Sequence, residues 1–436
     1  MMLKAEQRMN RLLLFFLFFS TFCKAQNVNF SAKGLLFLTD GDMSAFALAD
    51  GELRKSEGAN DLISGISFPL SYSNTEQFKS DLASNSIFNE GKCLAITRNQ
   101  KLAYVLENRG QTNKSDQKFE NIKDEFPIGK YITVVNIEDV EHPKSLYRFP
   151  AAGNPGSIAL SPQNNYLAVV SEEYGKEIQI FELDKEGKPF RIIAKPVDLP
   201  PGKISDVVWH PNGEFLVYLN QEEGNLGLIR MVTDGPTGQI IRQETLNEPL
   251  KIGGRLSMVK FTPDARYVIV LDRKKELTDQ ETNTKGELFV VRLHTNLGEK
   301  HALLSKAAVG ENPINFEFNS EGNYLIAANQ QRSFLPPDKF VNNGQSSISV
   351  LQIDLSGNIK NLVNFPIDGI LPNGLSFDKT GNNIAVSVYQ YLTFGYSFGG
   401  IEFFKFDPKA NPILQRQPGK IFVPRGIHSL KAVFDF

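Results

Sequence analysis

The chain has 436 residues, of which 41% are hydrophobic, 22% charged and 11% aromatic. This composition is that of an ordinary globular protein, and it excludes collagen-like, coiled-coil and disordered chains. The net charge is −2, and because the first 25 residues carry +3, the remainder carries −5, which argues against a general nucleic-acid binder.

Residues 1–25 have the order of a signal peptide. A basic stretch precedes the apolar run 12–19, and small residues follow at Cys23 and Ala25. We therefore predict cleavage after Ala25, a mature chain that begins at Gln26, and a periplasmic or secreted location. The alternative interpretation is lipid attachment at Cys23. No later apolar run approaches the ~18 residues of a membrane-spanning helix, so we predict no membrane span.

The body of the chain is a repeat. Six segments share an apolar strand, a polar turn and a second apolar strand, and they are 93–108, 157–173, 206–222, 258–274, 315–331 and 374–390. A third alternating strand follows each segment, at 132–136, 178–181, 226–229, 288–291, 348–351 and 401–404. A weaker fourth strand comes after it. The period of two excludes a helical repeat. Four antiparallel strands repeated every ~50–60 residues are typical of the blades of a β-propeller.

The two ends complete a seventh blade. Residues 426–436 resemble an inner strand, whereas 34–40, 44–50 and 61–69 resemble second, third and fourth strands that lack a first. Pairing the ends in one blade removes the sheet edge that each would otherwise expose. We therefore predict an all-β, seven-bladed β-propeller over residues 26–436. Its composite blade is formed from 34–70 and 426–436.

The blade sequence at 154–184, NPGSIALSPQNNYLAVVSEEYGKEIQIFELD, resembles the bacterial YVTN-repeat and lactonase-type propellers. The resemblance extends from Gly34 to Phe436. It implies seven blades, and it implies sugar-lactone hydrolysis of the 6-phosphogluconolactonase kind as one expected activity, because some members of that family hydrolyse such lactones.

The candidate site is the face where the inner strands begin and the second strands end, since functional loops gather around the central channel of a propeller. Aligning the repeats places one set of residues just before the inner strands and another just after the second strands. The predicted ligand-binding residues are Glu90, Asn154, Lys203, Arg255, Asn312, Arg332, Tyr389, Arg425 and His428. The candidate catalytic residues are His428, Arg255 and Glu172.

We expect Arg255, Arg425 and His428 to face Glu90, Asn154, Glu172 and Asn312 across the channel mouth. Guanidinium groups hold carboxylates and phosphates with paired hydrogen bonds, so this set favours a small anionic ligand. The alternative is a polar mouth that only binds water. The long loops at 108–130, 273–286, 331–346 and 390–399 extend over the same face, and the aromatic residues of the last suit a carbohydrate, unless the loops pack on one another.

The sequence predicts no metal and no cofactor. The five histidines do not show the spacing of zinc ligands. Asp40-Gly41-Asp42 offers calcium ligands, but a turn is the favoured interpretation. Cys93 lies in an apolar strand and is interpreted as a buried hydrophobic residue.

Three functions stay open at this point. The first is an exported binding or scaffold module for a small molecule or carbohydrate, without catalysis. The second is an enzyme on the same scaffold, a lactone hydrolase or a sugar lyase or cycloisomerase, which needs an acid–base group and a cation to stabilise an oxyanion. The third is a protein-docking platform, which needs exposed apolar patches. The fold does not decide among them, and the sequence identifies no protein partner.

Overall fold

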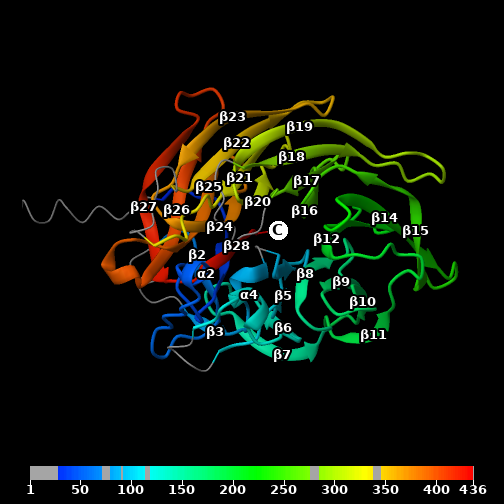
Figure 1. Ribbon diagram of the computed structural model, residues 1–436, viewed down its shortest axis with the longest axis horizontal. Coiled ribbons are helices and arrows are strands. Elements are labelled where there is room, and N and C mark those ends of the chain that lie inside the picture. Colours follow the sequence, from blue (N-terminus) through cyan, green and yellow to red (C-terminus); the bar gives the residue numbers. More distant parts are fainter. Residues whose placement is uncertain are drawn as a thin grey trace, which may run out of the picture.

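The computed structural model describes residues 28–70, 79–89, 92–112, 118–274, 284–336 and 345–435. The predicted signal peptide and the candidate residue Glu90 lie outside these ranges. Within them, the strands form seven four-stranded antiparallel sheets, which are arranged as blades around a common centre (Figure 1). The chain is therefore an all-β, seven-bladed propeller, as the repeats predict.

Blades 1 to 6 each use four consecutive strands, with the first nearest the centre and the fourth at the rim (Figure 1). Blade 1 consists of β4 (Leu94–Ile96), β5 (Leu102–Leu106), β6 (Tyr131–Asn136) and β7 (Lys144–Pro150). Blade 2 consists of β8 (Pro155–Leu160), β9 (Tyr166–Ser171), β10 (Ile178–Leu183) and β11 (Pro189–Ile193). Blade 3 consists of β12 (Ile204–Trp209), β13 (Phe215–Asn220), β14 (Asn225–Thr233) and β15 (Ile240–Lys251). Blade 4 consists of β16 (Leu256–Phe261), β17 (Val268–Asp272), β18 (Lys285–Arg292) and β19 (Ala302–Glu311). Blade 5 consists of β20 (Pro313–Phe318), β21 (Tyr324–Asn329), β22 (Ser347–Ile353) and β23 (Ile359–Pro366). Blade 6 consists of β24 (Ile370–Phe377), β25 (Asn383–Gln390), β26 (Phe398–Phe406) and β27 (Leu414–Pro424).

Blade 7 joins the two ends of the described chain. Its strands, in order, are β28 (Ile427–Val433), β1 (Gly34–Thr39), β2 (Leu62–Ser67) and β3 (Ser80–Leu82). The last strand of the chain, β28, pairs antiparallel with β1, so that Leu430 lies opposite Phe37. The C-terminal end accordingly lies at the centre of the ring in Figure 1. The predicted closure of the propeller through a composite blade is confirmed.

Two details of blade 7 correct the prediction. The segment 44–50, predicted as a strand, contains helix α2 (Ala47–Asp50), so 61–69 supplies the third strand rather than the fourth. The fourth strand is β3, which lies beyond the predicted limit at residue 70. The apolar pattern of 44–50 fits a strand, but its Ala and Leu residues favour a helix. Gly51 ends that helix in a left-handed conformation, with φ of 75°, and its N–H donates to the Ala47 carbonyl.

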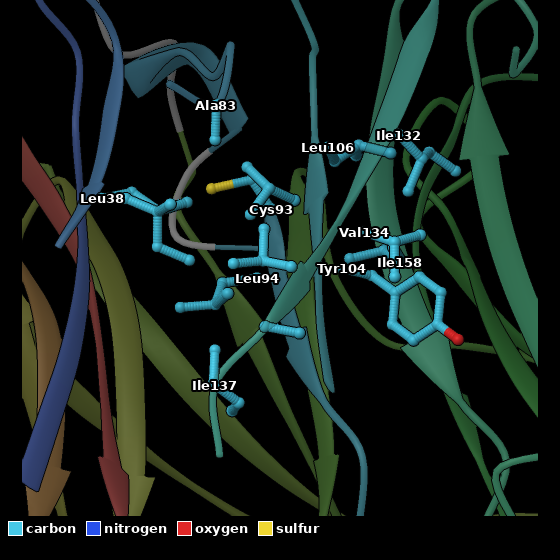
Figure 2. Close-up of a cluster of buried hydrophobic side chains, with 14 of the residues drawn as sticks. Leu38, Ala83, Cys93, Leu94, Tyr104, Leu106, Ile132, Val134, Ile137 and Ile158 are labelled. Atoms are coloured by element: carbon cyan, nitrogen blue, oxygen red, sulfur yellow. The ribbon is translucent and has the colours of Figure 1, made fainter. Parts of the chain in front are cut away.

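The hydrophobic core lies between neighbouring blades. In one such cluster, Leu38 of blade 7, Leu94 and Tyr104 of blade 1 and Leu167 of blade 2 are fully or almost fully buried. Figure 2 shows this cluster with the Cys93 side chain among its apolar neighbours. Cys93 is completely buried, as predicted. Among the described residues, no helix is long and apolar enough to cross a membrane.

A further apolar cluster lies on the face where the inner strands begin. We call it the cap. It is formed by helix α2 with its flanking loops, helix α4 (Ile122–Glu125) and the turn after β21, and it contacts the starts of blades 1 and 6. Its buried residues are Met43, Ala45, Phe46, Ala47, Leu48, Leu53, Ile87, Phe119, Ile122, Phe126, Phe334, Leu335, Ile370, Leu371 and Tyr389. The cap therefore covers part of the face on which the sequence predicts the ligand site.

Candidate functional site

The repeat positions before the inner strands are structurally equivalent. Asn154, Asn312 and Leu371 share a left-handed backbone, with φ of 49°, 49° and 53°. In blades 2 to 6, the pairing of the inner strand with its neighbour also shifts register within the first residues, as in a β-bulge. Such bulges re-aim the side chains beside them. The repeat alignment behind the predicted site therefore holds in three dimensions for blades 2 to 6.

Three predicted residues meet in one cavity, which we call the mouth pocket. Glu172 follows β9, Lys203 precedes β12 and Arg255 precedes β16, so blades 2, 3 and 4 each contribute one. Blade 1 adds residues that sequence reasoning missed. The lining residues are Phe88, Lys92, Asn108, Arg109, Lys123, Gly156, Val170, Ser171, Glu172, Lys203, Ile204, Ser205, Gln221 and Arg255. The cavity has a volume of about 50 Å³.

Glu172 is the centre of the charge network in the mouth pocket. Its Oε1 accepts a hydrogen bond from Lys203 Nζ at 2.7 Å, and its Oε2 accepts one from Arg109 Nη2 at 3.2 Å. Burial alone would raise the pKa of Glu172, but the charges and hydrogen bonds of Lys203 and Arg109 outweigh it and lower that pKa. Glu172 is therefore a carboxylate at neutral pH.

Arg109 carries an unused hydrogen-bonding group. Its Nε donates to the Lys123 carbonyl at 3.1 Å, and the residue is only 4% exposed. Its Nη1 is buried and has no hydrogen-bond partner among the described residues. An unpartnered buried donor is costly, and in a native structure it calls for an explanation such as a ligand or a water.

The mouth pocket is strongly cationic. Among the lining residues that the structure describes, five side chains are cationic and one, that of Glu172, is a carboxylate; the five are Lys92, Arg109, Lys123, Lys203 and Arg255. The whole chain, by contrast, has a net charge of −2. A cluster of one sign in a partly enclosed site focuses the field and attracts a ligand of the opposite sign.

Lys92 lines this pocket and is tied to the inner strands of two other blades. Its Nζ donates to the carbonyls of Ser205 and Ser257, each at 2.8 Å, and so links blade 1 to blades 3 and 4. The backbone at Arg255 is also fixed, because the Asp272 carboxylate accepts hydrogen bonds from the N–H groups of Gly254 and Arg255. The Lys92 side chain and the Arg255 backbone are thus held in place by the scaffold.

His428 does not line the mouth pocket, so its predicted meeting there with Arg255 and Glu172 is not found. It is fully buried in β28, where its Nε2 lies 2.7 Å from Asn85 Oδ1 and its Nδ1 lies 4.0 Å from Cys93 Sγ. Burial lowers the pKa of His428 to about 3 and raises the pKa of Cys93 to about 12. Both groups are therefore neutral, and they do not form a thiolate–imidazolium pair.

Four other predicted residues make internal contacts. Asn312 Oδ1 accepts a hydrogen bond from Arg273, and Arg332 Nε lies 3.9 Å from the Glu311 carboxylate. Tyr389 is buried in the cap, where its hydroxyl donates to the Met43 carbonyl at 2.9 Å, and Arg425 donates to the Arg54 carbonyl. Asn154 is partly buried and does not line the mouth pocket, although its carbonyl accepts from the Glu172 N–H. Of these residues, only Tyr389 belongs to the cap.

Three carboxyl groups lie together beneath the cap. Ligand atoms of Asp40, Asp42 and Asp61 are within 4.8 Å of one another, and all three residues are buried. The Asp42 N–H donates to Asp40 Oδ1 at 2.9 Å, which confirms a turn at Asp40-Gly41-Asp42. Lys55 Nζ lies 2.7 Å from Asp42 Oδ1 and supplies a positive charge. Burial, and then the charge of Asp42, raise the pKa of Asp40 to about 7.

The fold and this pocket define the class of protein, a seven-bladed β-propeller with a cationic mouth. Residues 157–335 match the lactonase, 7-bladed beta-propeller family. The resemblance to the lactonase-type propellers that the repeats predict is thereby confirmed. No curated protein matches the chain.

Similar solved structures share the fold over nearly the whole chain. A putative 6-phosphogluconolactonase from Bacteroides fragilis has a TM-score of 0.60 and 13% identity, and the match covers 92% of this chain and 98% of the other. A periplasmic gluconolactonase from Pseudomonas aeruginosa has a TM-score of 0.57 and 13% identity, over 92% and 99% of the two chains. A hypothetical selenium-binding protein from Sulfolobus tokodaii has a TM-score of 0.59 and 11% identity, over 94% and 97%. At such identities the likeness shows the fold alone.

Proposed function

We propose that the protein binds a small anionic sugar derivative, a sugar acid or an acidic sugar lactone, at the mouth pocket. The observation that carries this proposal is the excess of five cationic side chains over one carboxylate in a pocket on an acidic chain. Guanidinium groups can hold a carboxylate or a phosphate through two parallel hydrogen bonds. The unpartnered Nη1 of Arg109 is a donor of this kind.

The size of the mouth pocket favours a ligand whose anionic group enters the pocket while its sugar ring stays outside. Its volume of about 50 Å³ is far below the roughly 300–1,000 Å³ of sites that enclose a whole small molecule, so it suits an anionic group rather than a complete sugar ring. The ring would therefore lie outside, over the side chains of Glu172 and Lys203, which are 32% and 34% exposed. Two of the similar structures, a putative 6-phosphogluconolactonase and a periplasmic gluconolactonase, support this ligand class.

Arg255→Ala is expected to weaken binding of gluconate and 6-phosphogluconate by about tenfold, since it removes one charge-assisted contact. Isothermal titration measures the effect, with glucose as the uncharged ligand. The matched control is Arg266→Ala, because Arg266 is exposed in the β16–β17 turn of the same blade and pairs with Asp264. Equal affinities for Arg255→Ala and the native protein would rule out the mouth pocket as the anion site.

A second candidate function is hydrolysis of the lactone at the same pocket, and the match to the lactonase family favours it. Glu172, as a carboxylate, would take a proton from the attacking water. Arg109 or Arg255 would stabilise the oxyanion that forms when the water oxygen bonds to the lactone carbonyl carbon. The ring C–O bond then breaks, the departing ring oxygen takes up the proton held by Glu172, and the open-chain sugar acid results.

Glu172→Gln separates binding from hydrolysis. The substitution removes the negative charge that Lys203 and Arg109 now share, so binding of gluconate should become tighter by about threefold to tenfold at low salt. If the protein is a lactonase, the same substitution should lower kcat for glucono-δ-lactone by at least about a hundredfold. Glu173→Gln is the neighbouring control, because Glu173 pairs with Lys176 and does not line the pocket. Unchanged turnover in Glu172→Gln would exclude Glu172 as the base.

A further inference from the structure

A second cavity lies between blades 5 and 6, on the face of the propeller where the inner strands begin. It has a volume of about 420 Å³, which is within the range of about 300–1,000 Å³ for small-molecule sites. Like the mouth pocket, it is built from the residues that follow a second strand, here Tyr391 and Leu392 after β25, and from those that lead into an inner strand, here Ile367 to Ile370. Residues of the mouth pocket do not contribute to it.

The wall of this blade 5–6 cavity is mainly apolar. Ile367, Ile370 and Tyr391 are at most 4% exposed, so they form a fixed floor. Leu392 is 49% exposed and provides a lip toward the solvent. A fixed apolar floor with one exposed apolar edge suits the flat body of a small organic molecule better than a fully hydroxylated sugar.

One cation in this cavity is not neutralised by an ion pair. Lys420 Nζ lies 4.4 Å from the centroid of the Tyr391 ring and 4.8 Å from that of the Phe422 ring. Among the described residues, no carboxylate lies within salt-bridge distance of this ammonium group. The two aromatic rings thus hold a positive charge at the edge of an apolar cavity without cancelling it.

The neighbouring carboxylates are already engaged by another residue. Asp368, which also lines the cavity, accepts hydrogen bonds from Arg416 Nη1 at 3.1 Å and from Gln345 Nε2 at 2.8 Å. Glu402 lies 3.4 Å from Arg416 Nε and accepts a hydrogen bond from the Tyr391 hydroxyl at 3.2 Å. Arg416 is thus the ion-pair partner of both carboxylates. Lys420 acts on Glu402 through its charge but forms no salt bridge with it, and it is the cation that lines the cavity.

We propose that the blade 5–6 cavity is a second binding site, which takes a small organic carboxylate with an apolar body. The apolar body lies against Ile367, Ile370 and Tyr391, and the carboxylate pairs with Lys420. The charge complementarity selects the acid over the corresponding alcohol, because the alcohol fills the same apolar space but leaves the ammonium unpaired.

The test uses 3-phenylpropionate as the probe and 3-phenylpropan-1-ol as its uncharged counterpart. Each is titrated with the protein, and ligand-observed NMR measures its dissociation constant. The native protein should bind the acid in the millimolar range or tighter and the alcohol at least about tenfold more weakly. Lys420→Met keeps the length of the side chain but removes its charge, and it should weaken binding of the acid by about tenfold. Leu392→Asp, at an exposed position, should abolish binding by placing a like charge at the lip.

Lys203→Met is the matched control, because Lys203 lines the mouth pocket and should leave 3-phenylpropionate binding unchanged. The reverse also holds, since Lys420→Met should not alter gluconate binding. Absence of binding to the native protein at millimolar probe, equal affinity for acid and alcohol, or native affinity in Lys420→Met would each overturn this proposal. None of these results bears on the gluconate titrations, so the two sites succeed or fail independently.

Discussion

A chain that ends at His428 is expected to lose the cooperative unfolding transition of the full-length protein. It lacks most of β28, which pairs with β1 from Gly34 to Thr39. Leu430 and Val433 are at most 3% exposed, and burial of such side chains stabilises by roughly 1.5–3 kcal/mol each. The lost backbone hydrogen bonds between β1 and β28 add to this loss. The sum is then comparable with the whole free energy of unfolding of a domain, about 5–15 kcal/mol. Thermal and urea denaturation followed by circular dichroism measure the effect.

A chain that ends at Phe434 is the control for this truncation. It keeps every residue of β28 and should melt as the full-length protein does. If the chain ending at His428 also retained the native melting temperature, closure through blade 7 would contribute nothing to stability.

The carboxyl cluster beneath the cap is expected to make stability depend on pH. Asp40 has a pKa of about 7 in the folded protein, against 3.8 for the unperturbed group, chiefly because it is buried and secondarily because of the charge of Asp42. The folded state therefore holds a proton that the unfolded state has released. Below about pH 4 both states are protonated, and the stability is then lost progressively as the pH rises to about 7. The shift of about three units corresponds to a loss on the order of 4 kcal/mol.

The measurement is the difference in unfolding free energy between the native protein and Asp40→Asn, from urea denaturation at several pH values. The stability of the native protein relative to the variant should fall between about pH 4 and 7 and then level off. His428, whose low pKa removes stability toward acid pH, contributes equally to both proteins and cancels. Asp354→Asn is the control, because the pKa of the exposed Asp354 is lowered and it titrates below this window. The pKa of Asp61 is also raised, by burial and then by the charge of Asp40, so both carboxyl groups of the cluster contribute to the native curve. A difference that does not vary with pH would mean that Asp40 does not hold a proton of this cluster in the folded protein.

The strands of the propeller were predictable because each hairpin is a local pattern. Alternating apolar residues and a turn of Pro, Asn, Asp or Gly are enough to define β8 with β9 or β12 with β13. The repeat also defines equivalent positions, and this is why Glu172, Lys203 and Arg255 could be predicted to lie together. Their part in ligand binding stays a prediction.

The rest of the site depended on contacts that have no local signature. His428 lies where the repeat alignment places it, at the start of an inner strand, but its burial depends on Asn85 and the segments around it. Arg109 was missed because its contacts with Glu172 and with the Lys123 carbonyl have no local signature in the sequence. A search for cations just after each second strand would have included it, because it follows Glu107, the equivalent of Ser171.

The position of β28 also has a consequence for the order of folding. A growing chain produces β1 before any other strand, yet one edge of β1 has no partner until the last residues of β28 are synthesised. The first six blades are sequence-local and can form as they emerge, whereas the ring can close only afterwards. Contacts between distant parts of a chain form slowly, and an unpaired strand edge recruits other chains meanwhile. Nascent molecules are thus most prone to aggregate in the interval before β28 docks, when β1 still presents an open edge.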